Sequence, residues 1–303
     1  MANWSVEIEN LTKTFGEFAA VDHVSFRVRE GQIFGFLGPN GAGKSTTIRM
    51  LTGILPPTGG AGRVAGFDII RERRQIKQVI GYMSQKFSLY EDLTVKENLE
   101  FFGGVYGAGS FDWAVRVCRL ESVLDSLCSS LSVGLRQRVA LASAVVHRPR
   151  IVFLDEPTAG VDPASRRSFW ELIYDLASHG VTVFVSTHYM DEAEHCNYLA
   201  LINAGRIVAS GSPIELRERH FHSKLLELDC ESMFKWFDDL EKVPAIEEVA
   251  MYGNKLHLTT SDPEKAEAAI RELEGKNRLK VISLREITPS LEDIFVSVMT
   301  RQR

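Results

Sequence analysis

The chain has 303 residues, of which 45% are hydrophobic and 25% are charged, and its formal net charge is −5. These values suit a soluble globular protein with one large domain and a small one, and they give no basic footprint for a nucleic-acid partner. No segment approaches the ~20 consecutive apolar residues needed to span a bilayer, and the first residues lack a signal-peptide pattern, so any membrane link is expected through a partner.

The four cysteines are scattered along the chain and show no paired metal-ligand spacing. They are Cys118, Cys128, Cys196 and Cys230. Reduced structural thiols in a cytosolic protein are the expected state, and no dedicated metal site is expected from them.

The first elements expected along the chain are two strands. Val6 and Ile8, and then Val24, Phe26 and Val28, alternate with polar neighbours. This period of two is typical of half-buried antiparallel strands.

A glycine-rich loop lies between an apolar run at 33–37 and a helical pattern at 46–51. It consists of Gly38, Pro39, Asn40, Gly41, Ala42, Gly43, Lys44, Ser45 and Thr46. Such a loop meets a triphosphate with backbone N–H groups at a helix N-terminus. Lys44 is expected to reach the β- and γ-phosphates, and the Ser45 hydroxyl to ligate Mg²⁺. A plain glycine-rich turn is the alternative, which the strand and helix on either side disfavour.

A helical segment is expected after a strand that ends at Gln85. Thr94 and Glu97 form a capping box. Apolar residues at helical spacing follow it: Leu99, Phe101, Phe102, Val105 and Tyr106. We expect this stripe to be core, within a helical subdomain at about residues 86–147 inserted in an α/β fold.

Two further buried strands are expected to end in chemically active residues. Residues 151–157 run into Asp155 and Glu156, and residues 181–188 end at His188. Asp155 is placed to hold Mg²⁺ through water, and Glu156 to act as the base that polarises an attacking water. Asp162 and Pro163 mark a helix start between these strands.

These ordered motifs resemble the ATPase subunit of ABC transporters over nearly all of the first 220 residues. The resemblance implies an α/β P-loop NTPase core with an antiparallel β subdomain, and ATP and Mg²⁺ as ligands. Residue by residue, it makes Phe15 the ring that stacks on adenine, Gln85 the glutamine that contacts Mg²⁺ and senses the transporter, and His188 the γ-phosphate switch. The metal ligands are then Ser45, Gln85 and Asp155.

The resemblance also implies a site shared by two chains. The hydroxyl of Ser132 and the backbone of Gly134 bind the γ-phosphate of the nucleotide held by the opposite subunit, and Asp162 belongs to the loop that crosses between subunits. The family usually has Gly where this chain has Val133, and Gln or a similar residue where it has Leu135. Val133 restricts the backbone near the phosphate, but a working site is expected because both phosphate-binding positions remain.

Residues 221–303 are expected to form a separate small domain. The patterns predict a strand at 225–228, a helix at 232–240, a hairpin of 249–251 and 256–260, a helix to 273, a strand at 281–284 and a helix at 290–299. This order favours a ferredoxin-like α+β domain.

The segment 287–295 resembles the tail of ATPases that serve type-2 ABC exporters of drugs, polysaccharides or lipids. An exporter motor is therefore expected; an importer ATPase and a soluble ABC ATPase acting on ribosomes or DNA are the alternatives. The resemblance implies integral membrane partners, a homodimer or a heterodimer with a related ATPase, and a peripheral position on the cytoplasmic face of the membrane. Phe87, Leu89 and Tyr90 are the candidates for contact with the membrane subunit.

Overall fold

The computed structural model describes residues 3–85, 89–220, 223–231, 233–275 and 280–300. The chain divides into two compact units, Met1–Pro213 and Ile214–Arg303, which we call unit 1 and unit 2.

Unit 1 contains an antiparallel sheet with the strand order β2-β1-β4-β5. Its strands are β1 (Trp4–Phe15), β2 (Phe18–Arg29), β4 (Gly59–Val64) and β5 (Phe67–Asp68). Val6 pairs with Val28 and Ile8 with Phe26, and these side chains lie in the core. The two strands expected from alternation are confirmed.

The second sheet of unit 1 is mainly parallel, with the order β10-β9-β3-β8-β7-β6. Its strands are β3 (Ile33–Leu37), β6 (Ile80–Met83), β7 (Ile151–Asp155), β8 (Thr182–Thr187), β9 (Tyr198–Asn203) and β10 (Arg206–Gly211). Every residue of β3, β7 and β8 is buried, which is the reason for their continuous apolar runs. Because parallel strands end at one edge, the loops after β3, β6, β7 and β8 meet there.

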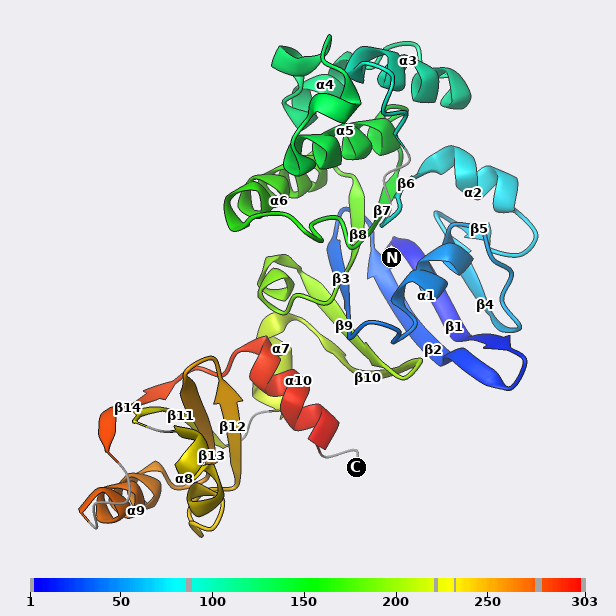
Figure 1. The fold of residues 1–303 in the computed structure, drawn as a ribbon. Helices are drawn as coiled ribbons and strands as arrows, with labels where there is room; N and C mark the ends of the chain where they lie inside the picture. Colours follow the sequence, from blue (N-terminus) through cyan, green and yellow to red (C-terminus); the bar gives the residue numbers. More distant parts are fainter. Residues whose placement is uncertain (1–2, 86–88, 221–222, 232, 276–279, 301–303) are drawn as a thin grey trace. The chain divides into compact units, whose positions relative to one another are not determined.

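Helices connect the strands of unit 1. They are α1 (Lys44–Leu51), α2 (Arg73–Val79), α3 (Val95–Tyr106), α4 (Asp112–Cys118), α5 (Val133–Val145) and α6 (Pro163–Ser178), with 3₁₀ turns at Glu121–Val123, Cys128–Ser130 and Asp191–His195. Figure 1 shows α3, α4 and α5 gathered at one end of unit 1. Helix α3 begins at the predicted capping box, in which Thr94 and Glu97 each accept a hydrogen bond from the other's backbone N–H.

The expectation that the apolar stripe of α3 is core is wrong for three of its members. Leu99 is buried, but Phe101 is 43% exposed, Val105 64% and Tyr106 38%. The helix packs against α5, and its buried face carries Val95, Asn98, Leu99 and Gly103. The wider stripe therefore extends beyond the packed face onto the surface.

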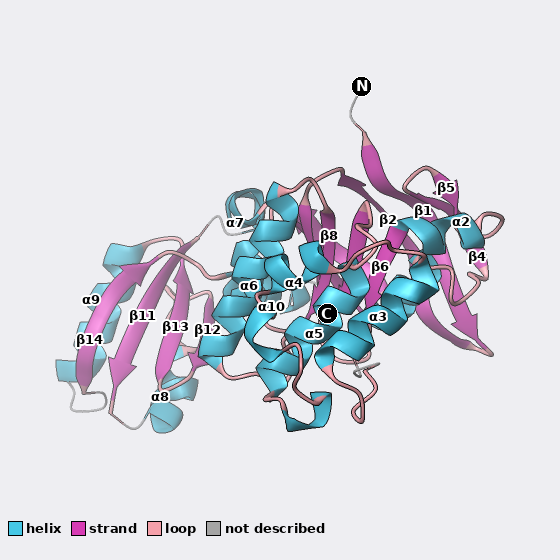
Figure 2. Cartoon of the chain, turned by 90° about the horizontal axis from the view of Figure 1, so that it is seen from above, coloured by secondary structure: helices cyan, strands magenta, loops and turns pink. Residues whose placement is uncertain are grey.

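Unit 2 is built around an antiparallel sheet with the order β12-β13-β11-β14. Its elements are α7 (Pro213–His220), β11 (Lys224–Cys230), α8 (Met233–Leu240), β12 (Glu248–Tyr252), β13 (Lys255–Thr260), α9 (Pro263–Gly275), β14 (Val281–Ile287) and α10 (Leu291–Thr300). Figure 2 shows the four strands side by side. The strand-helix-strand-strand-helix-strand order from β11 to β14 confirms the expected ferredoxin-like topology.

Within the described ranges, no helix combines the length and the apolar composition that a bilayer crossing requires. The four cysteines all fall inside these ranges and are buried free thiols.

Candidate functional site

The loop between β3 and α1 is shaped by glycines that no other residue could replace without movement. A Cβ on Gly38 would lie 2.1 Å from the carbonyl oxygen of Ile202, and one on Gly43 would lie 2.5 Å from that of Ala20. Gly43 also has φ +106° and is the N-cap of α1. Since glycine has no side chain to cap the helix, the first N–H groups of α1 remain available to an anion.

Lys44 is a buried cation within this loop. Its Nζ donates hydrogen bonds to the carbonyl oxygens of Gly38, at 2.7 Å, and Pro39, at 3.1 Å. The same Nζ lies 3.1 Å from Oε1 of Glu156. The loop therefore holds the lysine ammonium against the carboxylate that follows β7.

Glu156 is the point at which the loops of the sheet edge converge. Gln85, after β6, donates through Nε2 to Oε2 of Glu156 at 3.1 Å. Nδ1 of His188, after β8, lies 3.3 Å from the same oxygen. The backbone of Glu156 is left-handed, with φ +50°, which costs about 1 kcal/mol for a residue with a Cβ. Such strain is common at functional sites.

Asp155 is held by two hydroxyl groups. Ser45 donates to Oδ1 at 3.0 Å, and Ser186 donates to the same atom at 2.6 Å. Hydroxyl, carboxylate and amide oxygens are the ligands that Mg²⁺ prefers, so the set of Ser45, Gln85 and Asp155 fits this ion. Ser186 was not among the residues predicted for the site. The feature of the sequence that could have indicated it is a polar residue near the end of an otherwise apolar strand.

A cavity of about 520 Å³ joins these residues to the β1–β2 hairpin. It is lined by Phe15, Phe18, Ala20, Asn40, Gly41, Gly43, Lys44, Ser45, Thr46, Gln85 and Glu156. The rings of Phe15 and Phe18 are 51% and 65% exposed. Phe15 was expected here and Phe18 was not, although Phe15 and Phe18 are cross-strand partners at the hairpin tip.

Ser132, Gly134 and Asp162 lie at the starts of two other helices. Ser132 caps α5, and Asp162 caps α6 by accepting hydrogen bonds of 3.0 Å from the N–H groups of Ala164 and Ser165. Hydrogen bonds from Ser165 lower the pKa of Asp162. None of the three predicted residues is among the described residues that line the nucleotide-sized cavity of their own chain.

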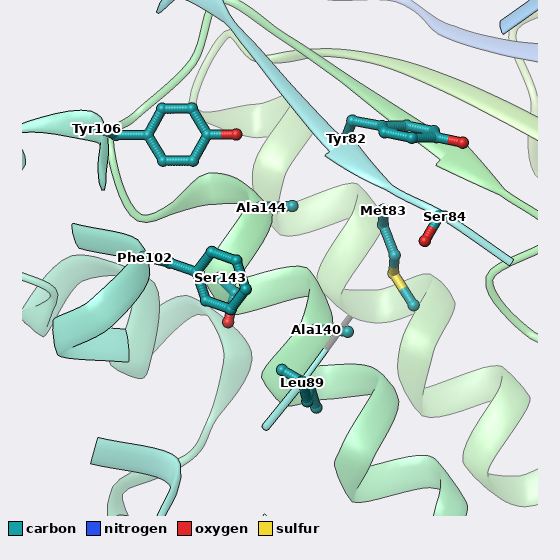
Figure 3. Close-up of a pocket in the computed structure, with 9 residues that line it drawn as sticks. All are labelled: Tyr82, Met83, Ser84, Leu89, Phe102, Tyr106, Ala140, Ser143 and Ala144. Carbon is teal, nitrogen blue, oxygen red and sulfur yellow. The ribbon is translucent and has the colours of Figure 1, made fainter. Parts of the chain in front are cut away.

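A second, largely apolar pocket lies between β6, α3 and α5. Its lining residues are Tyr82, Met83, Ser84, Leu89, Phe102, Tyr106, Ala140, Ser143 and Ala144 (Figure 3). We call it the α3–α5 groove. Of the residues predicted to contact the membrane subunit, Leu89 lines this groove, and Tyr90 is 45% exposed and packs on Phe101 with ring centroids 4.9 Å apart. The third candidate, Phe87, lies outside the described residues.

Comparison with known families gives two matches along the chain. Residues 21–159 match the family described as ABC transporter, and residues 211–299 match the ATP-binding protein DrrA1-3-like, C-terminal domain.

Two relatives are informative. The probable multidrug ABC transporter ATP-binding protein YbhF of Escherichia coli is 46% identical over 235 residues, which are 76% of this chain and 41% of YbhF. This chain thus spans less than half the length of that relative. The Nod factor export ATP-binding protein I of Cupriavidus metallidurans is 36% identical over 309 residues, which cover 98% of both chains.

Solved structures agree with this. CbiO1 of Clostridium perfringens, part of the ABC transporter complex cbiONQ, aligns with a TM-score of 0.66 at 26% identity, over 72% of this chain and 92% of that one. A dimeric post-hydrolysis structure of the cassette MJ0796 with ADP and Pi aligns with a TM-score of 0.62 at 26% identity, over 68% and 98%. The chain therefore belongs to the ATP-binding subunits of ABC transporters, in the group that carries a DrrA-like C-terminal domain.

Proposed function

We propose that this chain is the ATP-hydrolysing motor of an ABC exporter, attached to the cytoplasmic face of the membrane through an integral membrane partner. The observation that carries the proposal is the convergence of Lys44, Gln85 and His188 on the carboxylate of Glu156 beside the cavity. The cation can bind phosphate oxygens, the carboxylate can orient and polarise an attacking water, and the amide and imidazole can hold that carboxylate in place.

Each group has a proposed role in hydrolysis. The N–H groups of the loop 38–46 and Lys44 bind the phosphates of ATP, and Phe15 stacks on the adenine. Glu156 accepts a proton from the attacking water, and His188 contacts the γ-phosphate and keeps Glu156 in place. Ser45, Gln85 and Asp155 would hold Mg²⁺, which neutralises charge on the phosphates when it is bound.

The complete site is proposed to need two chains. Ser132 is exposed at the start of α5, where helix N–H groups favour an anion supplied by another molecule. Asp162 is exposed at the start of α6 and is proposed to lie on the loop that crosses to the other subunit. A homodimer with two equivalent sites is the simpler arrangement because this chain carries both halves. The dimeric form of the related cassette with ADP and Pi supports it.

The α3–α5 groove is proposed to receive a segment of the membrane subunit. It combines apolar walls with exposed aromatic rings, which suits a short helix packed from outside. Export rather than import is favoured by the DrrA-like C-terminal match and by the export and multidrug names of the relatives.

Glu156→Gln tests the motor. The amide cannot accept a proton, so ATP turnover is expected to fall by about 10²- to 10⁴-fold while ATP still binds. The trapped dimer should appear by light scattering after size exclusion with ATP. Glu171→Gln, at an exposed position of α6, is the matched control and should turn over normally. Normal turnover by Glu156→Gln would refute the base assignment.

Affinity purification from gently solubilised membranes tests the partner. A copurifying multi-helix membrane protein is expected, and Ala140→Phe, which fills the groove, should reduce its recovery while ATP binding persists. Exposed Ala268→Phe on α9 is the control. Recovery of only ribosomal or DNA-associated proteins would favour a soluble ABC ATPase instead.

A further inference from the structure

Behind the site, a buried network joins two loops that are far apart in sequence. The hydroxyl of Thr158 donates a short hydrogen bond to Oε1 of Glu192, and both side chains are about 1% exposed. Nε of Arg166 lies 3.8 Å from the same oxygen, and its Nη1 lies 3.3 Å from Oδ2 of Asp191. Burying a carboxylate costs free energy unless the group is paired, so the contacts with Thr158 and Arg166 offset the cost of burying Glu192.

The network begins close to the two groups proposed to act on the γ-phosphate. Thr158 is two residues after Glu156, and Glu192 is four residues after His188. Glu156 and His188 already meet at the site, with 3.3 Å between Oε2 and Nδ1. The two loops are therefore tied at two points, once at the site and once behind it.

Arg166 adds a third connection. Its guanidinium lies over the ring of Tyr189, 4.1 Å from the centroid, and the Tyr189 ring contacts that of His188 with centroids 4.1 Å apart. Arg166 belongs to the first turn of α6, four residues after the cap Asp162. A series of contacts thus runs from His188 through Tyr189, Arg166 and Glu192 to Thr158. The chain itself joins Thr158 to Glu156, two residues earlier.

The strained backbone of Glu156 needs this support. Its φ of +50° persists only where the surroundings hold it. On one side, the N–H of Glu156 donates to the carbonyl oxygen of Ser186, at 3.0 Å. On the other side, the Thr158–Glu192 hydrogen bond anchors the chain two residues later.

We propose that Thr158, Glu192 and Arg166 are positioning residues that fix Glu156 and His188 relative to each other, and so act on hydrolysis rather than on ATP binding. The inference rests on the proposed function. Substitutions of these residues should change hydrolysis and not ATP binding, because none of the three is among the described residues that line the nucleotide cavity.

A matched pair of substitutions in the purified chain provides the test. Thr158→Val removes the hydroxyl, and Thr158→Ser keeps it. Because small misplacements of reacting groups are costly, Thr158→Val is expected to lower kcat by about 10- to 100-fold with KM for ATP unchanged. Thr158→Ser should retain most of kcat. Equal kcat values for the two variants, or a change in KM alone, would overturn the inference.

A double-mutant cycle separates positioning from general support of the fold. Single-turnover hydrolysis is measured with and without Thr158→Val in a His188→Ala background. The decrease in rate caused by Thr158→Val should be smaller there, because the His188 side chain that Thr158 is proposed to position is absent. Full additivity would contradict the inference. If Thr158→Val does not fold, Glu192→Gln, which keeps shape and loses charge, replaces it with the same expectations.

Measuring Glu156→Gln in parallel separates a failure of the proposed hydrolysis mechanism from a failure of the positioning network. Normal turnover in Glu156→Gln would refute the assignment of Glu156 as the base, on which this inference rests. Loss of turnover in Glu156→Gln together with normal kcat in Thr158→Val defeats only the positioning network.

Discussion

Both units bury charged side chains on a sheet, but they do so in different places. In unit 1 the buried charged residues Lys44 and Glu156 follow parallel strands β3 and β7 and border a cavity. In unit 2 the buried charged residues Glu227 and His257 lie inside antiparallel strands β11 and β13. Asp293, at the start of α10, pairs with His257, and both line a small pocket of unit 2. There His257 is 2.7 Å from Asp293 and 3.8 Å from Glu227, and Glu227 also pairs with Lys255 and Arg285 at 2.7 Å.

The difference lies in how each set of charges is held. Groups on loops at a strand edge can exchange partners when a ligand arrives. Groups in a strand body are fixed by register, as His257 is opposite Glu227. Substitutions in the first set should alter ATP handling, and substitutions in the second should alter the stability of unit 2.

The largest effect is expected at Lys44. Lys44→Ala removes a cation that would make charge-assisted hydrogen bonds to phosphates, each worth about 1.5–3 kcal/mol. ATP affinity should therefore fall by about 10- to 100-fold or more, and hydrolysis should be lost. Fluorescent-nucleotide titration measures this. Lys77→Ala, on the exposed face of α2, is the control and should bind normally; equal losses in both would assign the effect to overall charge.

Asp293→Ala tests the other side of the comparison. It removes the partner of buried His257 and the carboxylate that accepts hydrogen bonds from Ser290 at the start of α10. The expected cost is about 2–3 kcal/mol of unfolding free energy, because a buried polar group loses its partner. Hydrogen exchange in β11 and β13 of the full chain should rise.

Exposed Glu292→Ala is the matched control for Asp293→Ala and should leave exchange unchanged. ATP turnover per folded molecule should stay the same in both variants. If ATP turnover fell together with the protection from hydrogen exchange in unit 2, the charges of unit 2 would also affect ATP handling, and the distinction between the two sheets would be wrong.

The smallest effect is a pH dependence at His147 of unit 1, which lacks the carboxylate partners of His257. Burial lowers the pKa of His147, whose Nε2 lies 3.0 Å from the Ile80 carbonyl oxygen and whose ring stacks on Tyr106 at 3.9 Å. The unfolded chain then binds a proton more readily than the folded one, so stability is lost as pH falls through about 6.5.

Thermal unfolding between pH 7.5 and 5.5 measures this loss. His147→Phe keeps a ring against Tyr106 and removes the titrating group, so its stability should depend less on pH than that of the parent chain. An identical pH slope in both proteins would exclude His147 as the source.

Local patterns were sufficient to predict much of this molecule. The capping box at Thr94, the helix start at Asp162 and the strand end at Asp155 depend on neighbouring residues, and all three are found in the structure. The strand expected to end at His188 ends one residue earlier, at Thr187. The order of the elements in unit 2 follows in the same way from periodicity.

Contacts across the sheet could not be predicted. Ser186 reaches Asp155 across 31 positions, and Thr158 reaches Glu192 across 34, because parallel strands β7 and β8 lie side by side. Single-sequence patterns contain no register between such strands. The exposure of Phe101 was missed for a related reason, since apolar spacing does not show how wide a packed helix face is.

The left-handed backbone of Glu156 has an evolutionary consequence. Glycine adopts φ +50° without strain, so Glu156→Gly should relieve part of this local cost, although it adds chain entropy to the unfolded state. A lineage selected only for a durable fold would gain nothing from a carboxylate here and would tend to lose it. A glutamate retained at this position in a descendant of this chain would therefore indicate continuing selection for turnover.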